Sequence, residues 1–111
     1  MTKTRPMKFP KRLVLDVIQE DIDNAREELK NLYNRRSASC PIAQSYRRTF
    51  NRYVLVGYGI LHTWNGPYST DYKAGKKAQA LIDNFDFNKN PVVPTKVTYT
   101  RIDPTLTPPS P

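Results

Sequence analysis

The segment Ser39–Gly59 carries three arginines and no acidic residue. Pro41 suits the first turn of a helix, where its missing N–H costs nothing, so Cys40 or Ser39 is expected to cap a helix here. The side chains expected to face solvent, opposite the apolar face of this helix, are Gln44, Arg47, Arg48 and Asn51. Arginine and lysine bind phosphates, while glutamine, arginine and asparagine match the hydrogen-bonding groups of base edges. The pattern therefore favours contact with nucleic acid.

Further basic and aromatic residues extend this candidate surface. Arg52 follows the helix. The start of the chain contributes five more basic residues, Lys3, Arg5, Lys8, Lys11 and Arg12. The first of these form a Pro-punctuated arm, residues 1–11, that could reach into a groove. Two helices, a tight break and a hairpin are similar to a helix-turn-helix followed by a wing. Tyr53, Tyr58, Trp64 and Tyr68 interleave with the basic segment, as a stacking surface for single strands requires.

Catalysis has little support in the sequence. Cys40 lies at a helix start, where a thiol pKa can fall. A cysteine phosphatase loop needs an arginine after five residues, however, and Tyr46 occupies that position. His62 is the only histidine, and one cysteine with one histidine does not make a conventional zinc site. With no phosphate loop or nucleophile elbow, we expect a non-enzymatic protein with no cofactor or metal and a structural, buried Cys40.

Length and charge restrict the remaining possibilities. A chain of 111 residues fits one domain, and its net charge of +8 favours a negatively charged partner. One cysteine excludes an internal disulfide framework. No apolar run is long enough to span a bilayer or to form a signal peptide, so we expect a cytoplasmic protein without a membrane partner.

Hydrophobic periodicity predicts an α+β domain over residues 12–102 with a small, mainly antiparallel sheet, between the arm (1–11) and a Pro-rich, disordered tail (103–111). The expected elements, in the order β-α-α-β-β-α-β, are a strand at 12–18, helices at 19–36 and 40–52, a strand at 53–64, a short strand near Tyr68, a third helix at 71–87 and a strand at 96–102. The dipeptide Asn65-Gly66 predicts a hairpin turn.

Several of these segments also carry a resemblance. They are "RLVLDVIQEDIDNA", the Cys-Pro-Ile-Ala opening of the second helix, and "ALIDNFDFNKNPVVPTKVTYT". Over most of residues 12–102 they resemble a group of small, uncharacterised proteins from bacteriophages and their hosts. The resemblance implies a phage or mobile-element origin, and it assigns no active site to Cys40, Pro41, Phe85 or Asp86.

Two hypotheses for function remain open. The first is a nucleic-acid-binding protein that uses the arginine-bearing helix face and the arm. The alternative is a phage effector that docks on an acidic host protein, with Trp64 and Tyr68 as anchors at an exposed hairpin tip. Self-association through an exposed strand edge, such as Lys96–Ile102, is compatible with either hypothesis.

Overall fold

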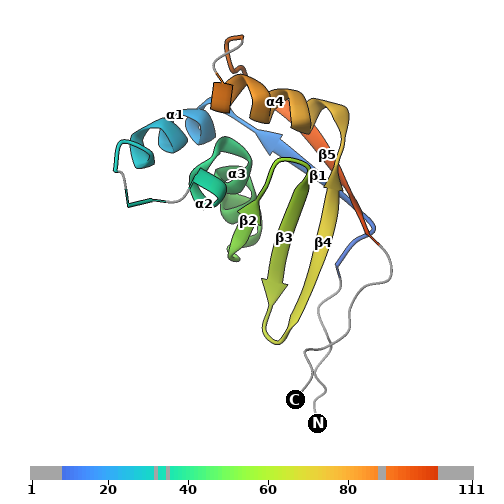
Figure 1. Cartoon of the computed structure of the whole chain (residues 1–111). Helices are drawn as coiled ribbons and strands as arrows, with labels where there is room; N and C mark the ends of the chain where they lie inside the picture. Colours follow the sequence, from blue (N-terminus) through green and yellow to red (C-terminus); the bar gives the residue numbers. More distant parts are fainter. Residues whose placement is uncertain (1–8, 32, 35, 88–89, 103–111) are drawn as a thin grey trace.

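The computed structural model describes residues 9–31, 33–34, 36–87 and 90–102, which fold into one sheet with helices against one of its faces (Figure 1). The elements within these ranges are β1 (Arg12–Val17), α1 (Gln19–Glu28), α2 (Arg36–Ser39), α3 (Pro41–Phe50), β2 (Val54–Val56), β3 (Ile60–Asn65), β4 (Tyr68–Ala74), α4 (Lys76–Phe87) and β5 (Thr95–Arg101). The predicted α+β class is confirmed.

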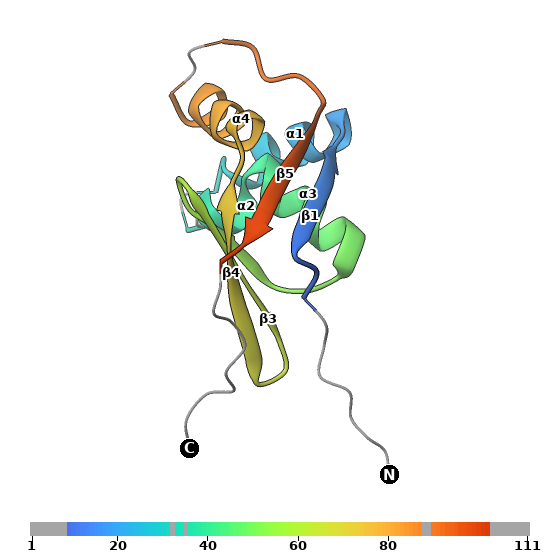
Figure 2. The ribbon, with the colours of Figure 1, turned by 90° about the vertical axis from the view of Figure 1, so that its right-hand side faces the viewer.

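The five strands lie in the order β1-β5-β4-β3-β2, and every neighbouring pair is antiparallel. Alternate side chains point inward, as Leu13, Leu15 and Val17 do from β1. Figure 2 shows β1 and β5 in front of α1 and α3, and α4 packs on the same side through Ala78, Leu81 and Ile82, which share the core with Val97 and Tyr99 of β5. No described helix covers the opposite face, which we call the outer face. By strand register and alternation it presents Arg12, Val14, Asp16, Leu55, Ile60, His62, Trp64, Ser69, Asp71, Lys73, Lys96, Thr98 and Thr100.

The core lies between the inner face of the sheet and the helices. Its fully enclosed side chains include Leu15, Ile22, Ile42, Tyr72, Val97 and Tyr99. Phe9, expected in the arm, is only 4% exposed and belongs to this core. The hydroxyl of Tyr72 donates to the carbonyl of Pro10 at 2.6 Å, and the backbone N–H of Arg101 donates to the carbonyl of Lys11 at 2.8 Å. The folded part therefore includes Phe9 and does not start at Arg12.

The helix predicted at 19–36 ends at Glu28, which corrects its length. The side-chain amide of Asn34 donates to the carbonyl of Glu28 at 2.7 Å, so the chain turns back after α1. Tyr33 is 93% exposed, so it does not continue the apolar stripe that was predicted for this helix. A short additional helix, α2, follows before Cys40.

The strand predicted at 53–64 is two antiparallel strands, β2 and β3, with Gly57–Gly59 in the turn between them. The backbone N–H of Gly57 donates to the carbonyl of Ile60 at 2.7 Å, and this bond closes the turn. The next hairpin turn consists of Gly66 and Pro67, because Asn65 still pairs with Tyr68. Gly66 has a φ of 61°, a value that favours glycine at the first position of such a turn.

Two further predictions about strands are wrong. Residues 71–74, expected in the third helix, belong to β4, and α4 begins at Lys76. Thr70, Tyr72 and Ala74 alternate toward the core while β4 pairs with both β3 and β5. β5 itself lies between β1 and β4, so the segment Lys96–Ile102 is not a free sheet edge available for self-association.

Candidate nucleic-acid interface

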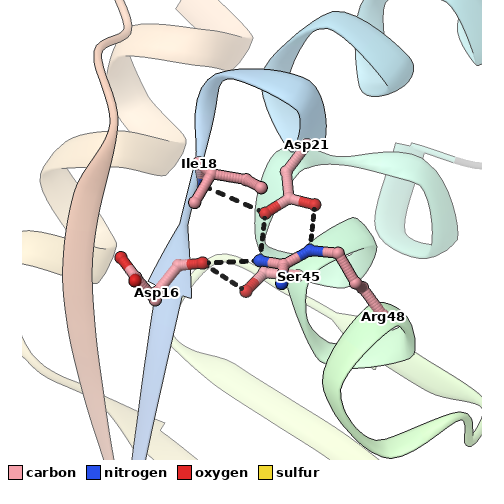
Figure 3. Close-up of polar contacts among 5 residues, drawn as sticks. All are labelled: Asp16, Ile18, Asp21, Ser45 and Arg48. Atoms are coloured by element: carbon pink, nitrogen blue, oxygen red, sulfur yellow. Dashed lines mark hydrogen bonds and ion pairs between the residues drawn. The ribbon is translucent and has the colours of Figure 1, made fainter.

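Arg48, expected to face solvent with its charge available, is bound to the start of α1. Its Nε and Nη2 atoms donate to the two carboxylate oxygens of Asp21 at 3.0 and 2.9 Å (Figure 3). Nη2 also donates to the carbonyl of Asp16 at 2.8 Å. Asp21 is 2% exposed and accepts a further bond from the backbone N–H of Ile18 at 3.0 Å. Arg48 is therefore the partner of a buried carboxylate.

The same cluster joins three elements, because Ser45 Oγ also donates to the carbonyl of Asp16 at 3.0 Å. As Figure 3 shows, two side chains of α3 thus converge on one carbonyl at the end of β1. β1 is an edge strand, and edge strands leave backbone groups without strand partners. The cluster occupies this carbonyl and fixes α3 against β1 and α1, which is a structural role.

The other residues of the predicted helix face are also engaged. Arg47 pairs with Glu28 at 3.4 Å, with both side chains partly exposed. Gln44 is buried, and its amide donates to the carbonyl of Ser39 at 3.2 Å, so its placement on the solvent face was wrong. Burial alone would raise the pKa of Glu28, but hydrogen bonds from Gln44 and Ser39 and the charge of Arg47 outweigh it and lower that pKa.

Asn51 ends the helix rather than extending its polar face. It adopts a left-handed conformation with a φ of 55°, and its backbone N–H donates to the carbonyl of Arg47 at 2.8 Å. Asparagine tolerates this conformation better than most residues, so it serves as a helix terminator here. Arg52 follows it and forms no ion pair within the described ranges.

The residues predicted outside this helix fall into two groups. Lys3, Arg5 and Lys8, like the tail 103–111, lie outside the described residues. Lys11 and Arg12 are exposed, and neither forms an ion pair in the described part of the chain. In the strand register Arg12 lies opposite Thr100, and Thr100 lies opposite Lys73 of β4. The sheet thus places Arg12 and Lys73 in one row of the outer face.

Sequence reasoning missed Lys73 as a candidate because it was assigned to a helix. Once β4 is recognised as a strand, period-two alternation puts Lys73 opposite to buried Tyr72 and Ala74. Lys73 is exposed and pairs in register with Ile60 of β3 on its other side. The signal was present in the sequence, but it competed with an equally good helical pattern.

Aromatic side chains lie at the β2 and β3 side of the outer face. The rings of Tyr53 and Trp64 are 5.3 Å apart, and His62 meets Trp64 edge-on at 4.3 Å. Nδ1 of His62 also bonds a carboxylate oxygen of Asp71 on β4. Trp64 is half-buried in this group and Tyr53 is 53% exposed. Tyr68, the other predicted anchor, packs against the core, so it is not a free side chain at the hairpin tip.

Cys40 caps α3 as predicted and is 5% exposed. Desolvation raises the pKa of its thiol from the ordinary 9.0 to about 11, and the nearby charge of Asp86 acts in the same direction. The structure does not bring Cys40 to His62, since the thiol lies in the core and the imidazole on the outer face.

We expect Cys40 to resist thiol reagents in the native protein. A pKa of about 11 leaves roughly a hundredfold less thiolate at pH 8 than a pKa of 9.0 would. A chromogenic disulfide reagent added at pH 8 should react slowly before urea denaturation and quickly after it. Fast stoichiometric reaction of the folded protein would contradict this assignment.

The described residues contain no cluster of three or more histidine, cysteine or acidic side chains that could hold a metal ion. None of the helices among them combines the length and the apolar character needed to cross a bilayer. Comparison of the chain with family models, with curated proteins and with solved structures finds no match to any of them. The resemblance to phage proteins therefore stays a prediction.

Proposed function

We propose that the protein binds single-stranded nucleic acid on the outer face of its sheet. The observation that supports this is an antiparallel face that no described helix covers: it carries His62 and Trp64, with Tyr53 against Trp64, and it places Lys73 and Arg12 in one row. Bases stack on aromatic rings at about 1–3 kcal/mol each, and lysine and arginine neutralise phosphates. The face therefore offers both interactions that a single strand needs.

The dimensions and the chain path suit this proposal. Neighbouring strands lie about 4.8 Å apart, so a strand laid across five of them would cover roughly 19 Å. Residues 9–11 join the fold beside β4 and β5 through the bonds to Tyr72 and Arg101. Lys11 and Arg12, the described basic residues at this point of the chain, therefore lie beside the sheet.

Duplex recognition by α3 is less favoured than the sequence indicated. A recognition helix must present free side chains to base edges in the major groove. Here Gln44 is buried, the partly exposed guanidinium of Arg48 is bound to Asp21, and Arg47 is paired with Glu28. The candidate surface for nucleic acid is therefore the sheet rather than α3.

A second candidate is an acidic host protein on the same face. The outer face also exposes Val14 and Ile60, which are 49% and 40% exposed, and the adjoining Ile102 is 38% exposed. Apolar side chains on an uncovered face favour a protein interface more than they favour contact with phosphates. We rank this second, because Trp64 is held within an aromatic group and Tyr68 packs on the core.

The test is fluorescence polarisation with labelled single-stranded DNA and RNA of about 12 nucleotides, and with a duplex of the same length. About three phosphate contacts give a slope near −2 in log affinity against log salt, so affinity should fall about 20-fold between 50 and 200 mM salt. Trp64→Ala and Lys73→Ala should each weaken binding by about tenfold.

Lys77→Ala is the matched control, because Lys77 is an exposed lysine of α4 away from the outer face. It should leave affinity within about twofold of wild type, since loss of a distant exposed charge is screened. Circular dichroism would check that each variant is folded. No binding of any single strand at 50 mM salt contradicts the proposal and favours the host-protein candidate.

A further inference from the structure

A surface hollow of about 280 Å³ lies where α3 ends and β2 begins, lined by Arg47, Asn51, Arg52 and Tyr53. Two of these four residues are arginines, and Arg52 forms no ion pair within the described ranges. Tyr53 also contacts Trp64 of the aromatic group. The hollow and the aromatic group on the outer face therefore share Tyr53.

We propose that this hollow binds a phosphate group of the strand whose bases stack on Tyr53 and Trp64; the inference rests on the function proposed above. Guanidinium groups bind phosphate oxygens bidentately, and an asparagine amide supplies a further donor. The hollow lies beside β2, the last strand of the sheet. A strand that crosses the face from Arg12 reaches a base-stacking site and then a phosphate site.

At this hollow the arginine side chains, and not the backbone of α3, supply the positive charge that would attract an anion. A helix C-terminus carries partial negative charge, so α3 itself repels phosphate here. Arg47 in its last turn and Arg52 just beyond it place two positive charges against this partial negative charge. Glu28, at 3.4 Å from Arg47, is the opposing group that a phosphate must compete with.

Three variants test the site with the same labelled single strand. Arg52→Ala should weaken binding about tenfold at 50 mM salt and reduce the salt slope by about 0.7, the value for one lost phosphate contact. Arg52→Lys should keep the slope but lose affinity, because lysine cannot bind bidentately. Glu28→Gln should strengthen binding by about threefold, since it releases Arg47.

Arg26→Ala is the charge-matched control, because Arg26 is an exposed arginine of α1 that does not line the hollow. Misfolding would lower affinity, so a gain of affinity in Glu28→Gln cannot result from a folding defect. Wild-type binding that depends on Trp64 but is unchanged by Arg52→Ala, in both affinity and slope, would overturn the phosphate site alone. Failure of wild type to bind would overturn the proposed function as well.

Discussion

Replacing Arg48 with alanine is expected to destabilise the protein by about 3 kcal/mol, because it leaves the buried carboxylate of Asp21 without its charged partner. Asp21 would keep only the bond from the backbone N–H of Ile18. The carbonyl of Asp16 would also lose the Nη2 donor, although Ser45 continues to bond it. Urea unfolding followed by circular dichroism measures the loss as a lower midpoint at an unchanged slope.

Arg47→Ala is the matched control, one residue away on the same helix. Its pair with Glu28 joins two partly exposed side chains at 3.4 Å, and such pairs contribute about 0–1 kcal/mol. Asp21→Asn tests the cluster from the other side, because it removes the buried charge while keeping the volume. If Arg47→Ala and Arg48→Ala proved equally mild, the Asp21 cluster would not be the structural centre that the geometry indicates.

The structural role of Arg48 changes which variants can test nucleic-acid binding. A double Arg47→Ala, Arg48→Ala variant, which the sequence alone would recommend, removes a structural ion pair along with surface charge. Weaker binding of that variant would report loss of folded protein as much as loss of phosphate contacts. Lys73 and Arg52 are better choices, because neither forms an ion pair in the described ranges of the chain.

The features predicted correctly from the sequence are those with local signals. The short aliphatic and β-branched run from Arg12 to Ile18 predicted β1, and Cys40-Pro41 predicted the start of α3. The partner of Arg48 was not predictable in this way, because Asp21 lies 27 residues earlier in the chain. The segment around Arg48 has no acid in sequence but has one in space, and only the packing of α1 on α3 shows it.

The boundary between β4 and α4 shows a second limit. Tyr72, Gly75 and Ala78 are three residues apart and fit a helical stripe, while Thr70, Tyr72 and Ala74 fit a strand. The strand forms because β3 and β5 supply partners on both sides of β4. Whether this segment forms a strand or a helix depends on tertiary pairing. Because it forms a strand, Lys73 lies on the candidate interface and not on the surface of a helix, where it was expected.

Gly75, at this same boundary, gives the second large expected effect: Gly75→Ala should destabilise the protein by about 2 kcal/mol. A Cβ atom there would lie 2.9 Å from Thr98 Oγ1 and 3.0 Å from the Thr98 carbonyl oxygen. The backbone N–H of Gly75 already donates to that carbonyl at 2.9 Å, so β4 and β5 cannot separate without losing this bond. Thermal or urea unfolding would measure the loss.

Gly59→Ala separates this steric cost from the general effect of replacing glycine. Its added Cβ would meet only Gln79 Nε2, at an ordinary 3.6 Å. Both variants restrict the unfolded chain by a similar amount, worth about 0.4–1 kcal/mol of stabilisation, so their difference isolates the contact with Thr98. In a Thr98→Ala background the hydroxyl contact is absent while the carbonyl remains, so Gly75→Ala should recover only part of its lost stability. If Gly75→Ala recovered all of its lost stability in this background, the clash would come from the Thr98 hydroxyl alone. The backbone contact between β4 and β5 would then not explain the need for glycine at this position.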